Sequence, residues 1–217
     1  MRCASDTGRK PSSAAAPCRR QWDDRSPLVP TGIKGHLKRM LTLNRDSSAL
    51  LLIDFQSRLM PAIADGAAVV ANARRLLKAA QLFGIPVLIT EENASGLGMT
   101  VPELTEGTEA PVFAKLSFDA CRMPGFAAAL PDRPDIVVAG CETHVCVMQT
   151  VLGLIGASKR VYLVRDAVGS RRPESKETAI RRLERHGAEI ITTEMAVFEW
   201  LGTAEDPRFR EALALIR

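Results

Sequence analysis

The chain has 217 residues, of which 46% are hydrophobic and 25% charged, an ordinary composition for a globular protein with one large core. Nine Lys and Arg, against three Asp, lie in the first 39 residues, so the remaining residues carry 20 basic and 22 acidic side chains. The net charge of +4 therefore arises at one end of the chain, and the rest is no basic platform for nucleic acid. Five cysteines, an odd number, give no framework of paired disulfides and fit a reducing intracellular setting.

Residues 1–39 mix Arg, Ser, Ala, Pro and Asp without a helical or strand period, and we expect them to be disordered. Translation that starts at Met40 is one hypothesis for this segment; an organelle transit peptide and a nucleic-acid-binding arm are the alternatives. No apolar run approaches the roughly 20 residues of a membrane-spanning helix, and the first 30 residues lack a secretory signal. We therefore expect a cytoplasmic protein with one folded domain over 40–217 and no membrane or nucleic-acid partner.

From residue 48 on, short apolar runs alternate with amphipathic helices. The apolar runs predict strands at 49–53, 86–90, 111–114, 136–139, 161–164 and 189–192. Helical spacing predicts helices over 69–83, 143–155, 174–186 and 206–216, two of them closed by Gly84 and Gly187. Continuous apolar strands separated by helices are typical of a parallel sheet covered on both faces. The sequence thus predicts an α/β three-layer sandwich with a mainly parallel sheet of about six strands.

The most informative segment is Ala139-Gly140-Cys141-Glu142-Thr143-His144-Val145-Cys146, where the fourth predicted strand turns into a helix. A helix N-terminus carries unpaired N–H groups and partial positive charge, which favour a cysteine thiolate and can bind an oxyanion. Functional groups of such sheets gather beyond the carboxyl ends of the strands, where Asp54 and Lys115 also stand. Together they can perform acyl transfer: Lys115 favours the thiolate of Cys146, and Asp54 accepts and returns a proton.

In these segments the chain resembles the cysteine hydrolases of the isochorismatase-like superfamily, which includes nicotinamidases, carbamoylsarcosine-type amidases and ureido- or maleamate-type amidohydrolases. The resemblance extends over roughly residues 46–200 and rests on five segments in the family's order: Leu51-Leu52-Ile53-Asp54-Phe55-Gln56, Thr90-Glu91, Lys115-Leu116-Ser117-Phe118-Asp119-Ala120, 139–147 and Arg165-Asp166-Ala167-Val168. It implies Cys146 as the nucleophile, Asp54 as the proton acceptor and Lys115 as the activating cation. It also implies a cis peptide between Cys141 and Glu142 that aims backbone amides into an oxyanion hole, and a homo-oligomeric assembly.

The chain departs from the nicotinamidases at their metal site. Those enzymes bind a metal through an Asp-x-His pair after the first strand and a later His, but position 56 is Gln, and no histidine occurs between His36 and His144. We therefore expect no metal site of that type and no cofactor, and nicotinamide is disfavoured as the substrate. His144 also stands where many amidases of the superfamily carry Asp.

The remaining site residues are assigned by their place beside the catalytic positions. We expect substrate contacts from the neighbours of the three catalytic residues: Phe55, Gln56, Leu116, Phe118, Thr143, His144 and Val147. Cys141 and Cys121 are interpreted as structural, and Glu142 either orients substrate or faces solvent. Arg171 and Arg172 are expected on a solvated helix face.

The resulting hypothesis is a hydrolase that opens an amide, ureido or similar C–N bond of a small molecule through a thioester on Cys146. The founding isochorismate-cleaving enzymes attack a vinyl ether without a thiol nucleophile, so Cys146 favours C–N hydrolysis over that chemistry. Two alternatives stay open: a binding or assembly protein of the same fold, and a redox sensor in which Cys141 resolves a sulfenic acid on Cys146.

Overall fold

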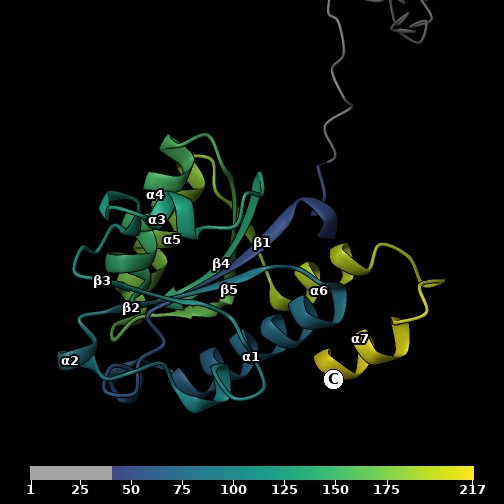
Figure 1. The fold of residues 1–217 in the computed structure, drawn as a ribbon, viewed down its shortest axis with the longest axis horizontal. Helices are drawn as coiled ribbons and strands as arrows, with labels where there is room; N and C mark the ends of the chain where they lie inside the picture. Colours follow the sequence, from purple (N-terminus) through teal and green to yellow (C-terminus); the bar gives the residue numbers. More distant parts are fainter. Residues whose placement is uncertain (1–40) are drawn as a thin grey trace, which may run out of the picture. The chain divides into compact units, whose positions relative to one another are not determined.

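The computed structural model describes residues 41–217, and Figure 1 shows their fold. The expectations of disorder over 1–39 and of a start at Met40 fall outside these residues. Six parallel strands form one sheet in the order β3-β2-β1-β4-β5-β6. Their bounds are β1 Ser48–Ile53, β2 Val87–Glu92, β3 Val112–Lys115, β4 Asp135–Cys141, β5 Arg160–Gly169 and β6 Glu189–Ile191. The predicted parallel sheet is confirmed.

Helices cover both faces of this sheet, which gives the three layers (Figure 1). One face carries α1 (Gly66–Phe83), α6 (Thr193–Leu201) and α7 (Phe209–Ile216). The other carries α3 (Phe126–Ala129), α4 (Met148–Gly156) and α5 (Pro173–Arg185). The remaining helical pieces are short: α2 Ala94–Leu97, a π-helical turn at Thr143–Val147, and 3-10 turns at Arg45–Ser47, Met60–Ala62, Pro102–Leu104 and Ala120–Arg122. No helix within 41–217 is long and apolar enough to cross a bilayer.

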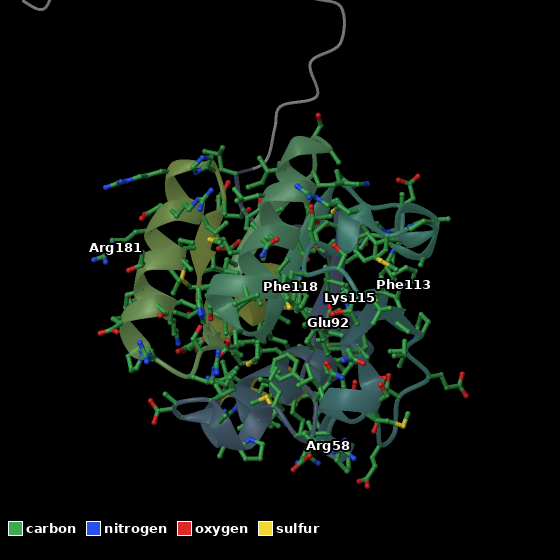
Figure 2. The ribbon with its side chains drawn as sticks, turned by 90° about the vertical axis from the view of Figure 1, so that its left-hand side faces the viewer. Arg58, Glu92, Phe113, Lys115, Phe118 and Arg181 are labelled. Atoms are coloured by element: carbon green, nitrogen blue, oxygen red, sulfur yellow. The ribbon has the colours of Figure 1, made fainter. Side chains whose placement is uncertain are left out.

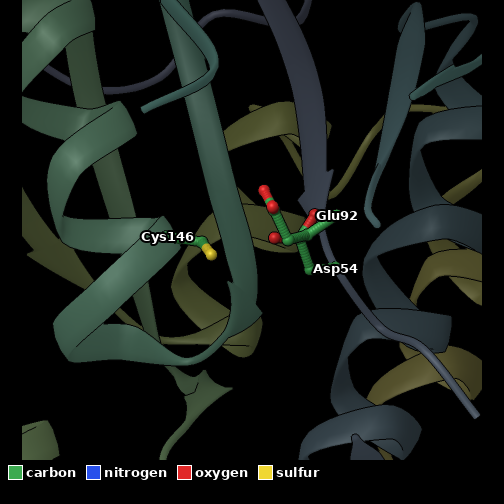
Figure 3. Close-up of side chains that lie close together, drawn as sticks. All are labelled: Asp54, Glu92 and Cys146. Carbon is green, nitrogen blue, oxygen red and sulfur yellow. The ribbon is translucent and has the colours of Figure 1, made fainter. Parts of the chain in front are cut away.

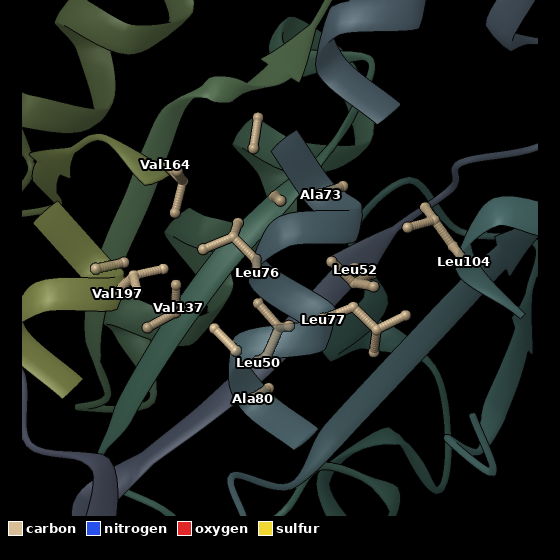
Figure 4. Close-up of a cluster of buried hydrophobic side chains, with 14 of the residues drawn as sticks. Leu50, Leu52, Ala73, Leu76, Leu77, Ala80, Leu104, Val137, Val164 and Val197 are labelled. Atoms are coloured by element: carbon tan, nitrogen blue, oxygen red, sulfur yellow. The ribbon is translucent and has the colours of Figure 1, made fainter. Parts of the chain in front are cut away.

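The central strand β1 is buried along its whole length, which explains its unbroken apolar sequence. Leu50 and Leu52 pack against the face of α1 that carries Leu76 and Leu77, as Figure 4 shows. The alternate residues of β1 belong to the second core, on the side of α4. Both faces of the strand are therefore buried in the cores, so residues beyond its carboxyl end are the ones that can contribute to a site.

The predicted elements match the observed ones to within a few residues at most ends, but the four-residue helices α2 and α3 and the longer helix α6 were missed. The strand predicted at 86–90 runs on to Glu92, and the helix predicted over 143–155 begins as the π-helical turn. The helix α6 follows β6 after a single residue, Thr192, whose hydroxyl accepts a hydrogen bond from the Met195 N–H at 3.3 Å. Because this N-cap residue sits inside the predicted strand 189–192, the helix start was hidden from the sequence pattern.

Gly140 lies in β4 beside the last residue of β1, at the carboxyl edge of the sheet. It pairs with Ile53, and a Cβ built on it would lie 2.5 Å from the Ile53 carbonyl oxygen. We expect Gly140→Ala to lower the free energy of unfolding by about 1–3 kcal/mol, because the two strands must move apart. Chemical denaturation measures this loss. Gly156→Ala, where a Cβ meets nothing within 4 Å, is the control, and an equal loss in both variants would refute the steric explanation.

Candidate active site

Asp54, Lys115 and Cys146 meet at the carboxyl edge of the sheet. Asp54 is the first residue after β1, Lys115 ends β3, and Cys146 lies in the π-helical turn that follows β4. Lys115 Nζ is 2.7 Å from Asp54 Oδ2, across the intervening strand β2. The Cys146 sulfur and a carboxylate oxygen of Asp54 lie within 4.8 Å of each other, as Figure 3 illustrates. Three side chains distant in sequence are thus brought together by strand order.

The Asp54 carboxylate is held at both of its oxygens. Thr90 Oγ1 donates a hydrogen bond of 2.7 Å to Oδ1, while Lys115 binds Oδ2. The Asp54 backbone has a φ of 55°, a left-handed conformation that Asp adopts more readily than most residues. Burial raises the pKa of Asp54, although Lys115 and Thr90 oppose that rise. A carboxyl with a raised pKa is suited to exchanging protons during a reaction.

Glu92, a residue that sequence reasoning missed, joins the same ion pair. Its Oε2 is 2.9 Å from Lys115 Nζ, and Figure 2 labels both side chains. The side chains of Lys115 and Asp54 have no exposed surface, and that of Glu92 is 9% exposed. Burial alone would lower the pKa of Lys115, but Asp54, Cys146 and Glu92 raise it above its ordinary value. Lys115 is therefore an ammonium, and we refer to Asp54, Glu92, Lys115 and Cys146 as the buried cluster.

Gln56 fixes the position of Glu92. The Gln56 amide nitrogen donates to the backbone carbonyls of Glu92 (3.0 Å) and Gly98 (2.6 Å), and its amide oxygen accepts from the Glu92 N–H at 3.0 Å. The amide is thus occupied by backbone groups, and the expectation that Gln56 contacts substrate is not supported. Gln56 is fully buried, so its amide has to be satisfied by groups of the protein itself.

The thiol of Cys146 differs from the sequence expectation in its ionisation. Burial, followed by the negative charge of Asp54, raises the pKa of this thiol, and Lys115 offsets only part of the rise. Lys115 acts in the predicted direction, since it lowers the pKa of the thiol, but burial and Asp54 outweigh it in the free protein. The direction of this shift favours the thiol over the thiolate, and Cys146 as a whole is 7% exposed.

The peptide bond between Cys141 and Glu142 is cis, as the resemblance implied. Cys141 is buried, and burial raises the pKa of its thiol to about 12, in agreement with a structural role. Burial also acts to raise the pKa of Glu142, but hydrogen bonds from Arg171 outweigh it and lower that pKa. Arg171 Nε lies 2.7 Å from Glu142 Oε1. Arg171 precedes α5 and its side chain is 62% exposed, so the expected exposure to solvent is confirmed, whereas its expected place on a helix is wrong.

Three of the residues expected to contact substrate are fully buried instead. Phe55 and Val147 have no exposed surface and belong to the two hydrophobic cores. Thr143 donates its hydroxyl hydrogen to the Gly169 carbonyl oxygen at 2.9 Å. The prediction that these side chains line a pocket is not supported, because each faces the interior of the protein.

The other three predicted contact residues remain at the surface or near it. His144 is partly exposed, and its Nδ1 lies 3.1 Å from the Ser170 hydroxyl oxygen. Leu116 is 76% exposed and Phe118 is 51% exposed, one and three residues after Lys115. Figure 2 labels Phe118 and Lys115. These two are large apolar side chains left in water by the single chain.

Among the described residues, ligand atoms of Asp54, Glu92 and Cys146 lie within 4.8 Å of one another, a spacing that a metal ion can bridge. The ammonium of Lys115 already binds both carboxylates of this group. The cation that this arrangement accommodates is therefore the lysine of the chain itself.

A parallel sheet of six strands in this order, covered by helices on both faces, has the architecture of isochorismatase-like proteins. The model of the isochorismatase domain matches residues 48–195, and the chain belongs to the isochorismatase family. The resemblance inferred from the five sequence segments is confirmed.

Among curated proteins, the chain is 36% identical over 178 residues to isochorismatase domain-containing protein 1 of Danio rerio. That match covers 81% of this chain and 62% of the fish protein, so the chain spans less than two thirds of that relative. It is 35% identical to isochorismatase domain-containing protein 2 of Xenopus laevis, covering 83% of this chain and 88% of the frog protein.

Solved structures share the fold. One described as a MAR1 ribonuclease from Caenorhabditis elegans is 34% identical, with a TM-score of 0.77, and covers 81% of this chain and 92% of its own. YcaC from Pseudomonas aeruginosa, described with covalent acrylamide, is 25% identical with a TM-score of 0.77 over 82% of this chain and 92% of its own. YcaC from Escherichia coli, described as an octameric hydrolase of unknown specificity, is 25% identical with a TM-score of 0.74. The match covers 82% of this chain and 89% of the YcaC chain.

Proposed function

We propose that this protein hydrolyses a C–N bond of a small-molecule amide or ureido compound, with Cys146 as the nucleophile. The observation that carries the proposal is the Asp54–Lys115 ion pair of 2.7 Å beside the Cys146 sulfur. A thiol, a proton acceptor and a fixed cation are the groups that acyl transfer through a covalent intermediate requires.

In the first half of the reaction, Asp54 takes the proton of the Cys146 thiol as the sulfur attacks the substrate carbonyl carbon. The carbonyl oxygen becomes an oxyanion, and the backbone N–H of Glu142, which follows the cis bond, is our candidate for binding it. Asp54 then passes its proton to the leaving nitrogen, the C–N bond breaks, and the acyl group stays on sulfur as a thioester. Lys115 holds Asp54 in place throughout, since it binds Oδ2 directly.

In the second half, the Asp54 carboxylate removes a proton from water, which attacks the thioester carbon. The C–S bond breaks, the acid product leaves, and Asp54 returns its proton to the sulfur. The proton balance closes, because the thiol and the carboxylate end as they began. The raised pKa values of both groups suit a single proton that moves between them.

Chemistry described for a relative supports this assignment. The Pseudomonas aeruginosa YcaC structure is described with covalent acrylamide, which is both an electrophile and a primary amide. A nucleophile that adds to such a compound is what we propose for Cys146.

The name ribonuclease, printed for the Caenorhabditis elegans structure, marks a rival function. RNA binding relies on cations that neutralise phosphates, whereas residues 40–217 carry 20 basic and 22 acidic side chains. The buried cluster also places two carboxylates beside the thiol. We therefore favour a small substrate over a polyanion.

Redox sensing by Cys146 and Cys141 has less support than hydrolysis. Oxidation to a sulfenic acid requires thiolate character and exposure, but burial raises the pKa of both thiols. A purely binding or assembly role does not require the ion pair of Asp54 and Lys115 beside a thiol. Cleavage of a vinyl ether of the isochorismate type does not require the thiol of Cys146.

We further propose that the working form is a homo-oligomer. The exposed apolar side chains Leu116 and Phe118 lie one and three residues after Lys115, and burial of such a pair favours association. The Escherichia coli YcaC structure is described as octameric, which supports the proposal by analogy.

An ammonia-release assay over primary amides, ureido acids and maleamate-type compounds tests the function. We expect at least one class to release ammonia, and rapid-quench mass spectrometry to detect the acyl group on the Cys146 peptide. Protein whose Cys146 has been blocked with iodoacetamide is the control. Folded protein that turns over a compound with equal speed before and after blocking would contradict the mechanism.

A further inference from the structure

The buried cluster contains more negative than positive charge. Both oxygens of Asp54 accept hydrogen bonds, as an ionised carboxylate does, and Glu92 is ion-paired with Lys115. One ammonium thus faces two carboxylates, which leaves one negative charge in excess before any charge on the sulfur is counted. The three side chains of the ion pair are nearly sealed from solvent, so water screens this excess charge only weakly.

Both the backbone and the side chain of Glu92 are fixed by hydrogen bonds and an ion pair within the protein. Gln56 binds both the N–H and the carbonyl of its backbone, and Lys115 binds its carboxylate. The preceding residue, Glu91, has a different role, because its carboxylate accepts hydrogen bonds from the backbone N–H and the hydroxyl of Thr100. Of the two adjacent glutamates, Glu92 is the one placed beside the nucleophile.

We propose that Glu92 determines which substrate charge the site prefers. The net negative charge of the buried cluster makes Cys146 react with neutral or cationic amides in preference to amides with a carboxylate near the scissile bond. Attack on a carbonyl adds an oxyanion to a region that is already negative, and a substrate carboxylate adds a further repulsion. The selection among amide substrates rests on the proposed hydrolysis, whereas the effect of charge on the reactivity of Cys146 does not. Glu92 acts through charge and through Lys115, so it is a specificity-determining residue.

The charged and titratable groups that face Glu92 come from three elements. They are Lys115 at the end of β3, Asp54 after β1 and Cys146 in the π-helical turn. The negative charge of Glu92 is one of the causes that raise the pKa of Cys146. Removal of this charge with little change in shape, as in Glu92→Gln, is therefore expected to favour the thiolate.

Alkylation of Cys146 by two matched reagents, neutral iodoacetamide and anionic iodoacetate, tests the proposal without any substrate. In both reactions the sulfur gives up its proton, displaces iodide and forms a C–S bond, so the two differ in reagent charge alone. Peptide-level mass spectrometry measures the two rate constants at Cys146, and N-acetylcysteine gives the ratio for an unrestricted thiol. We expect the wild-type ratio of amide to acid rate constants to exceed that reference about tenfold.

In Glu92→Gln we expect the ratio to fall close to the reference and the iodoacetamide reaction at neutral pH to become faster. A purely structural role for Glu92 predicts the opposite: a loosened Lys115 slows both reagents and leaves the ratio unchanged. Glu91→Gln, matched in chain position and burial, is the control and is expected to keep the wild-type ratio. Glu92→Asp, which retains the charge, should keep most of the preference.

Two results would overturn the inference: a wild-type ratio equal to that of N-acetylcysteine, or equal ratios in wild type and folded Glu92→Gln. The first needs no variant, so it decides even where Glu92→Gln does not fold. Because alkylation needs no turnover, a charge preference without any amide hydrolysis would contradict the proposed function alone. Hydrolysis with no charge preference would contradict only the role of Glu92.

Discussion

Substitution of Cys146 by serine is expected to reduce amide hydrolysis by at least about 10⁴-fold and to remove the covalent acyl-enzyme. Serine keeps the size and the hydrogen-bonding proton, but its hydroxyl is a far weaker nucleophile, and Asp54 is a weak base for it. Ammonia release measured with the best substrate gives the rate, and rapid-quench mass spectrometry gives the occupancy of the intermediate. The fold should be unaffected, because the side chain is nearly isosteric.

Cys121→Ser is the matched control for this substitution. Its thiol lies 3.8 Å from the Thr150 carbonyl oxygen, on the α4 side of the sheet, and burial raises its pKa to about 12. We expect this variant to retain nearly full activity. A Cys146→Ser protein that kept a tenth of the wild-type rate would rule out sulfur as the nucleophile.

Replacement of Lys115 by methionine is expected to cost the largest amount of stability of any change discussed here. It leaves two buried carboxylates without their cation, and a broken buried ion pair costs about 3–5 kcal/mol. Without the ammonium, the pKa of Asp54 rises further above its unfolded value, because Lys115 is the group that opposes the effect of burial. The loss is therefore greatest at high pH and shrinks as the pH falls and both carboxyls take up protons.

Urea denaturation at pH 8 and at pH 5 measures this loss and its pH dependence. Lys159→Met is the control, because Lys159 pairs at the surface with exposed Asp132 and should matter by less than about 1 kcal/mol. The combined variant with Asp54→Asn, Glu92→Gln and Lys115→Met should regain stability while staying inactive. A loss for Lys115→Met that is equal at both pH values would show that the carboxylates are not its cause.

The fold could be predicted from the chain because a parallel sheet imposes a simple pattern. Each inner strand is an unbroken apolar run, and a residue just beyond such a run must lie at the common carboxyl edge. Asp54, Lys115 and Cys146 satisfied that rule, so their meeting was predictable without coordinates. For the remaining site residues, the prediction depends on whether each side chain points into the core or toward the site. The short segments that follow the strands do not specify this direction.

Glu92 and Phe55 illustrate this limit. The apolar pattern ended the second strand at Thr90, which left Glu92 outside the sheet, although β2 continues and brings it opposite Lys115. Phe55 follows Asp54 directly and was assigned to the pocket, but it turns into the core. The direction of the Cys146 pKa shift could not be predicted from the sequence either. It depends on the balance between burial, the negative charge of Asp54 and the positive charge of Lys115.

The sealing of Lys115 and Asp54 from water has a consequence for how the protein responds to its surroundings. Counterions weaken attractions between charges only where they can approach them, and neither side chain presents any surface to the medium. The local field at the reactive sulfur is thus a property of the folded chain and changes little between dilute and concentrated electrolyte. At a given pH, the sulfur of Cys146 is therefore expected to keep the same reactivity over a wide range of salt concentration.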